Sequence, residues 1–241
     1  MEKIINIENL RQFAYVNHKI CKKPIKGIVL SFFGLGNTSM FSNEIAEGEF
    51  YGEHGILYVV PYTNPWSWMN KQSIELVDEI IDVIINYYEL SENIAIVSSG
   101  GSMGGQSAIV YMAYAKRTPI ACVANCPVCD MVYHYNERKD LPRTLYSAFF
   151  NEQGSLIDIL KKYSPLHLMD KLPKVKYHLF HCNNDKEVNI QAHSSTFVEK
   201  MKINHFDITY DVVLDRGHCD LSEEMKKKYV NYIIEEIKNQ F

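Results

Sequence analysis

The chain has 241 residues, of which 46% are hydrophobic and 22% charged, a composition typical of a globular protein. This length suits one large core, so we expect residues 1–241 to form a single domain. The net charge of −4 excludes a strongly basic surface, and nucleic acid is not an expected partner. We expect no membrane association and a cytoplasmic location, because no segment has the apolar length of a signal peptide core or a membrane span.

Apolar, β-branched runs alternate with amphipathic stretches along the chain. This alternation predicts an α/β fold, with helices on both faces of a mostly parallel central sheet. In chain order, we expect one or two antiparallel strands in the first twenty residues, then strands at 27–33 and 55–61, a helix at 71–88, a strand at 94–98, a helix at 105–116, strands at 120–125 and 175–182, a helix at 191–202, a strand at 206–214 and a helix at 222–239.

The segment NIAIVSSGGSMGG, which begins at Asn93, runs from a predicted strand through a glycine-rich turn into a predicted helix. A nucleophilic serine needs such a tight turn, whose flanking positions tolerate almost no side chain. Gly100 and Gly104 meet that need around Ser102. The pattern therefore predicts a nucleophile elbow with Ser102 as nucleophile, and the N–H of Met103 at the helix start as an oxyanion donor.

Two alternative interpretations of this turn remain open. It is compatible with a glycine-rich connection in which Ser102 has no chemical role. A phosphate-binding loop is disfavoured, since the lysine of G-x-x-x-x-G-K-[ST] is missing and Ser102 stands where a G-x-G-x-x-G motif needs its second glycine.

A serine nucleophile needs a histidine base, which a carboxylate must orient. In the chain order Ser, Asp, His, these groups are expected at the carboxyl ends of later strands. Asp185 follows the strand at 175–182, and His218 lies in the loop after the strand at 206–214. We predict a triad of Ser102, Asp185 and His218, with Asp130 as the alternative acid because it also follows a strand.

Further site residues are expected in the loops after the first two parallel strands. In LSFFGLGNTS, the flanking glycines free the backbone, so the N–H of Leu35 is the predicted second oxyanion donor. In PYTNPWSWMN, the side chains of Trp66, Trp68 and Met69 are candidates for the substrate pocket, with a packed aromatic loop as the alternative.

Residues 126–174 separate two strands by about twice the length that a crossover needs. We interpret them as a short helical insertion, which either lies over the strand ends as a candidate lid or decorates the periphery of the domain.

The pair Cys126 and Cys129 matches C-x-x-C, but no further ligand pair follows at zinc-site spacing. We therefore expect the two thiols to be structural, with no metal and no cofactor.

With these sites in place, the chain resembles the α/β-hydrolase superfamily from about Lys26 onward. The elbow, the segment YSPLHLMDKLPKVKYHLFHCNNDKEV and DRGHCD are similar to single-domain members related to the prolyl oligopeptidase and dienelactone hydrolase groups. The resemblance implies Ser102 as nucleophile, Asp185 as acid and His218 as base. The chain departs from the family where Phe33 replaces the histidine of the common His-Gly oxyanion motif. Its serine also differs from the cysteine nucleophile of dienelactone hydrolases.

These observations predict a serine hydrolase that cleaves a small ester, as a carboxylesterase does, through an acyl-enzyme intermediate. One alternative is a peptidase or aminoacyl hydrolase acting on short peptides. Another is a non-catalytic, ligand-binding member of the fold, because a fold does not guarantee activity. The expected partner is thus a small-molecule ester or short peptide, and the sequence does not indicate an oligomeric state.

Overall fold

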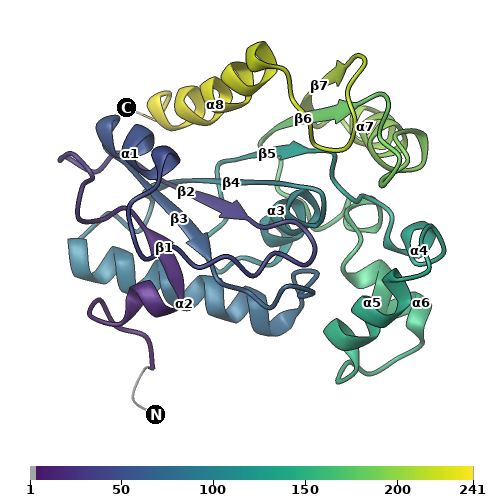
Figure 1. Ribbon diagram of the computed structural model, residues 1–241, viewed down its shortest axis with the longest axis horizontal. Coiled ribbons are helices and arrows are strands. Elements are labelled where there is room, and N and C mark those ends of the chain that lie inside the picture. Colours follow the sequence, from purple (N-terminus) through teal and green to yellow (C-terminus); the bar gives the residue numbers. More distant parts are fainter. Residues whose placement is uncertain (1–3, 241) are drawn as a thin grey trace.

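A computed structural model of the chain describes residues 4–240 (Figure 1). Within them, one seven-stranded sheet has the strand order β1-β3-β2-β4-β5-β6-β7. Its first strand, β1 (Ala14–Val16), pairs antiparallel with β3, and the other neighbouring strands are parallel. The predictions of a mostly parallel sheet and of an antiparallel strand near the N-terminus are both confirmed.

The six predicted parallel strands are present, with small differences at their ends. They are β2 (Gly27–Phe32), β3 (Ile56–Pro61), β4 (Ala95–Gly101), β5 (Ala121–Asn125), β6 (Lys176–Cys182) and β7 (Asp207–Val213). The largest difference is in β4, which continues to Gly101 because Gly100 pairs with both neighbouring strands and Gly101 pairs with Asn125 of β5.

The predicted helices are also present, as α2 (Lys71–Tyr88), α3 (Met103–Tyr114), α7 (Thr196–Ile203) and α8 (Glu223–Lys238). On α2, five isoleucines and one valine at helical spacing form a buried stripe: Ile74, Val77, Ile80, Ile81, Ile84 and Ile85. Asn70 caps the helix by accepting the Ser73 N–H. Residues Gln191–Ser195 form a π-helical turn before α7. One further helix, α1 (Ala46–Glu53), was not expected, since its two glycines and lack of an apolar stripe hide it from periodicity.

Helices cover both faces of the sheet, as predicted. One core cluster joins the sheet to α2, α3 and α7, and a second joins the opposite face to α1 and α8. Figure 1 shows α8 and α2 on opposite sides of the strands. The parallel strands are apolar on both faces because both faces are buried.

The predicted insertion contains α4 (Met131–His134), α5 (Leu141–Phe149), α6 (Leu156–Lys162) and a 3-10 turn at Pro165–His167. The helical content expected for this segment is confirmed. In Figure 1 these helices lie together on the side toward which the arrows of β5 and β6 point. The insertion is anchored to α3 by Gln106, whose Nε2 donates 2.8 Å to the Tyr163 carbonyl.

Candidate active site

Ser102 lies between the end of β4 and the first residue of α3, in the turn predicted as a nucleophile elbow. Its φ is 59° and its ψ is −125°, a backbone conformation that a residue with a Cβ rarely adopts. Such strain persists only where the surrounding structure holds it, and it concentrates at functional sites. The turn therefore presents the Ser102 side chain in a strained geometry that an idle serine does not require.

The glycines around Ser102 allow the close packing of this turn. A Cβ built on Gly104 would lie 2.1 Å from the Phe32 carbonyl oxygen, and one on Gly100 would lie 2.4 Å from the Gly104 carbonyl oxygen. Both distances are far below van der Waals contact, so a larger residue would push α3 away from the sheet. The two glycines thus hold the start of α3, with its free N–H groups, against the end of β4.

Asn125, the last residue of β5, connects the elbow to the loop that carries His218. It pairs with Gly101 in the sheet, and its carbonyl oxygen accepts the Ser102 N–H at 2.9 Å. Its side-chain Nδ2 donates to the Cys219 carbonyl at 3.2 Å. A Cβ on Gly101 would also lie 3.2 Å from Cys219 Sγ. The sheet register therefore brings the serine turn and the histidine loop to the same edge.

His218 and Asp185 form a close hydrogen-bonded pair at this edge. His218 Nδ1 lies 2.7 Å from Asp185 Oδ2, and the Asp185 carboxylate is fully buried. The other carboxylate oxygen accepts the backbone N–H groups of Glu187 and Val188. Because the carboxylate can only accept, Nδ1 carries the proton of the neutral imidazole, whose Nε2 lone pair is then left for another partner.

A second histidine, His181, supports the Asp185 carboxylate. Its Nε2 lies 3.1 Å from the Val188 carbonyl and 3.3 Å from Asp185 Oδ2, while its Nδ1 lies 2.6 Å from Ser194 Oγ. Burial by itself raises the pKa of the Asp185 carboxyl, but hydrogen bonds from His181 and His218 outweigh it and hold that pKa well below its ordinary range. Asp185 is therefore ionised.

The predicted oxyanion loop passes beside Ser102. A Cβ on Gly34 would lie 3.9 Å from the Ser102 Cβ, which places the neighbouring Leu35 close to the elbow. The Gly36 N–H is taken up by the Pro65 carbonyl at 2.9 Å. Met103 is the first residue of α3, and the first N–H groups of a helix have no acceptor within it.

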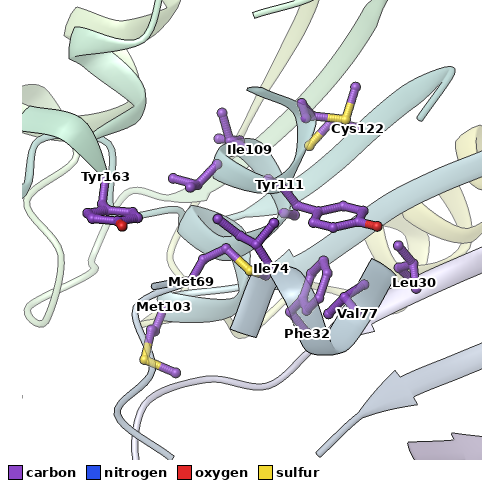
Figure 2. Close-up of a cluster of buried hydrophobic side chains, with 14 of the residues drawn as sticks. Leu30, Phe32, Met69, Ile74, Val77, Met103, Ile109, Tyr111, Cys122 and Tyr163 are labelled. Carbon is purple, nitrogen blue, oxygen red and sulfur yellow. The ribbon is translucent and has the colours of Figure 1, made fainter. Parts of the chain in front are cut away.

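The three candidate pocket residues do not come together. Trp68 and Met69 are 1% and 0% exposed and belong to the core, where Figure 2 shows Met69 beside Ile74. Trp68 Nε1 donates to Thr144 Oγ1 of α5 at 3.1 Å, which ties the loop to the insertion. Trp66 alone remains partly exposed, and it lines a cavity of about 520 Å³ together with the end of α5. The loop thus serves packing at Trp68 and Met69, the alternative left open by the sequence.

The alternative acid, Asp130, has a different role in the structure. Its carboxylate caps α4 by accepting the N–H groups of Val132 and Tyr133.

Cys126 and Cys129 are both buried, in different core clusters, and all six cysteines are free thiols. The C-x-x-C pair therefore does not act as one unit.

The environment of His218 leads to a prediction about pH. Burial by itself lowers the pKa of His218, but the interactions with the Asp185 carboxylate and with Cys126 together raise it more, and the pKa lies above its ordinary value of 6.5. A base works only when neutral, so kcat/KM should fall as the pH drops through this raised pKa. We expect the acidic limb of the kcat/KM profile to have an apparent pKa above 6.5. A limb at or below that value would contradict the pairing.

We compared the chain with known protein families, curated proteins and solved structures. A sequence model described as the prolyl oligopeptidase family matches residues 71–240. No curated protein matches the sequence significantly. Within residues 4–240, no helix combines the length and hydropathy that crossing a bilayer requires.

Three solved structures illustrate the structural similarity. Dipeptidyl peptidase 4 of Porphyromonas gingivalis matches with a TM-score of 0.69 and 13% identity over 94% of this chain, which spans 33% of the peptidase. Esterase B of Lactobacillus Rhamnosis matches with a TM-score of 0.67 and 11% identity. The match covers 91% of this chain and 79% of the esterase chain. FphF, a fluorophosphonate-binding serine hydrolase of Staphylococcus aureus, matches with a TM-score of 0.67 and 16% identity. The match covers 90% of this chain and 84% of FphF. The predicted α/β-hydrolase fold is confirmed.

Sequence reasoning missed several residues that shape this edge. No motif distinguishes these residues in the sequence: Asn125 ends a predicted strand, His181 lies within another, and Cys219 follows His218. Their contacts depend on which strands are adjacent, and no local pattern reports that. A rule that examines the last residue of each strand beside the nucleophile would have found Asn125.

Proposed function

Since this chain belongs to the prolyl oligopeptidase family, we propose that it is a serine hydrolase whose Ser102, His218 and Asp185 cleave a small carboxylic ester. The observation that carries the proposal is the hydrogen-bonded pair of the buried Asp185 carboxylate and the partly exposed His218 imidazole, 2.7 Å apart, at the sheet edge that also holds the strained Ser102. A serine turn without a chemical role would not need a histidine oriented by a carboxylate at the same sheet edge. Prolyl oligopeptidase family membership and the α/β-hydrolase fold both support hydrolysis.

In the proposed mechanism, Ser102 Oγ attacks the acyl carbon while His218 Nε2 takes its proton. The ionised Asp185 stabilises the resulting imidazolium through Nδ1. The N–H groups of Leu35 and Met103 stabilise the oxyanion. His218 then gives the proton to the leaving alcohol, and a water activated by the same imidazole releases the acid and frees Ser102.

Ester cleavage is our first choice of reaction. The two neighbours matched over most of their length are an esterase and a fluorophosphonate-binding serine hydrolase, whereas the peptidase is matched over about a third. The second candidate is hydrolysis of an aminoacyl or short peptide bond, favoured by the family match. A third, ligand binding without catalysis, is disfavoured by the oriented imidazole.

The proposal is tested by fluorophosphonate labelling followed by a substrate panel. We expect the probe to label Ser102, and p-nitrophenyl esters of short acids to be cleaved with a higher kcat/KM than aminoacyl arylamides carrying the same acyl size. Faster arylamide cleavage would favour the peptidase candidate. Absence of labelling in folded protein would favour the non-catalytic one.

A further inference from the structure

Two cysteines lie beside the imidazole of His218. Cys126 follows β5, and Cys219 follows His218 in the loop after β7. The possible ligand atoms of Cys126, His218 and Cys219 all lie within 4.8 Å of one another. Cys219 Sγ is 3.7 Å from His218 Nε2, the nitrogen that the proposed mechanism uses as base. We propose that these three side chains form a binding site for a thiophilic divalent cation such as Zn²⁺ or Cd²⁺, which blocks hydrolysis when bound.

The spacing of these atoms suits tetrahedral coordination. Zinc bonds sulfur at about 2.3 Å and nitrogen at about 2.0 Å, so at the tetrahedral angle the two ligand atoms stand roughly 3.6 Å apart. The observed separation of Cys219 Sγ and His218 Nε2 is 3.7 Å. A small movement of Cys126 Sγ within its 4.8 Å limit would complete a Cys₂His set, with a fourth position left for water.

The groups around these ligands already provide the hydrogen bonds that a metal site needs. Cys126 Sγ accepts the backbone N–H groups of Cys182 and Cys219, each at 3.4 Å. Such bonds stabilise a metal-bound thiolate. The Asp185 carboxylate holds the proton on His218 Nδ1 and turns the Nε2 lone pair outward, which is the carboxylate–histidine arrangement found behind zinc ligands.

Two other groups of ligating side chains in residues 4–240 are less suited to a cation. In the group of His134, Glu137 and His193, the Glu137 carboxylate accepts from both imidazoles, and His193 Nδ1 accepts two backbone N–H groups. In the group of Cys126, His181 and Asp185, both nitrogens of His181 are hydrogen-bonded. The hydrogen-bonded nitrogens of His181 and His193 have oxygen or backbone partners, whereas the contacts of the His218 ring beyond Asp185 are with the two cysteines themselves.

A cation can reach the proposed site. The His218 side chain is 23% exposed and Cys219 is half-buried, although Cys126 is buried. On binding, each thiol gives its proton to solvent as its sulfur bonds the metal, so no oxidant or reductant is required. Metal on Nε2 occupies the lone pair that would take the proton of Ser102. The site itself rests on geometry alone, and only its inhibitory effect rests on the proposed function.

The first experiment measures metal binding without activity. Reduced protein is titrated with Cd²⁺, and the thiolate-to-metal charge-transfer absorption is followed. We expect about one equivalent to bind, and Cys219→Ser to weaken binding by more than about a hundredfold, since even outer-shell partners contribute roughly 10- to 100-fold. Cys126→Ser should act in the same direction. Cys21→Ser, at a half-buried thiol outside this group, is the matched control and should bind as the original protein does.

The second experiment measures inhibition. Zn²⁺ should suppress fluorophosphonate labelling and ester cleavage, a chelator should restore both, and Cys219→Ser should remove the suppression relative to its own metal-free activity. If Cys126→Ser does not fold, the half-buried Cys219 position keeps the test available.

The proposal is overturned if Cd²⁺ produces no thiolate band, or if Cys219→Ser binds Cd²⁺ as tightly as the original protein. It is also overturned if His134→Gln, and not the cysteine changes, abolishes binding. A protein that binds Cd²⁺ but has no hydrolase activity would contradict the proposed function and leave the metal site standing.

Discussion

Replacing Ser102 with alanine is expected to lower kcat by about 10⁴- to 10⁶-fold and to abolish labelling by a fluorophosphonate probe. The physical reason is that no other hydroxyl is held in the strained turn between β4 and α3, where Ser102 has a φ of 59°. Alanine has the same Cβ and removes only the oxygen, so the fold should be unchanged. Ester hydrolysis, probe labelling and circular dichroism check the three expectations.

The matched control is Ser107→Ala, which changes a buried serine of α3, the helix that follows Ser102; the Ser107 hydroxyl donates to Gln106 Oε1. It should retain activity within about tenfold, because it removes one hydrogen bond of modest net energy and no reacting group. A Ser102→Ala enzyme that keeps a tenth of the original turnover would end the proposal that Ser102 is the nucleophile.

Replacing Asp185 with asparagine is expected to reduce kcat/KM by more than about a hundredfold. The amide cannot stabilise the imidazolium of His218, and its NH₂ group can impose the wrong tautomer on the ring. Since the hydrogen bond to the carboxylate is the largest of the interactions that raise the pKa of His218, the acidic limb of the pH profile should also move to lower pH in the variant. Steady-state kinetics over a pH series measures both effects.

Asp130→Asn is the control for this substitution. Asp130 caps α4, and asparagine is about as good as aspartate at that position of a helix, so the change should be nearly silent. If Asp130→Asn were the damaging change and Asp185→Asn the silent one, the acid of the site would have to be reassigned to the end of β5.

The α/β architecture and most of its elements follow from local patterns in the sequence. A strand that is buried on both faces has a run of apolar residues in its sequence. A helix that packs on one face, such as α2, has an apolar stripe at helical spacing, so both kinds of element can be recognised from the local sequence. The helix α1 could not be read in this way, because Gly48 and Gly52 interrupt any stripe and it packs through Tyr51 alone among its large side chains.

The sequence also singled out Ser102, Asp185 and His218, because chain order and strand ends limit where such groups can stand. It left Asp130 open as the acid, since both aspartates follow strands. The structure distinguishes them by contact: Asp185 lies 2.7 Å from His218, and Asp130 is occupied with the N-terminus of α4. The contact between Asp185 and His218 joins loops that are separated along the chain, so local sequence patterns do not reveal it.

The surroundings of the site depend on long-range packing, which the sequence does not reveal. Trp68 and Met69 follow a strand end as pocket residues would, but both are buried, and the insertion contacts Trp68 through Thr144. No local pattern predicts which segments pack together. In the same way, Cys126 lies three positions before Cys129 yet contacts Cys219 instead. Backbone pairing of β4, β5 and β6 sets these neighbours, because side chains at one sheet edge meet through strand order and register rather than through sequence separation.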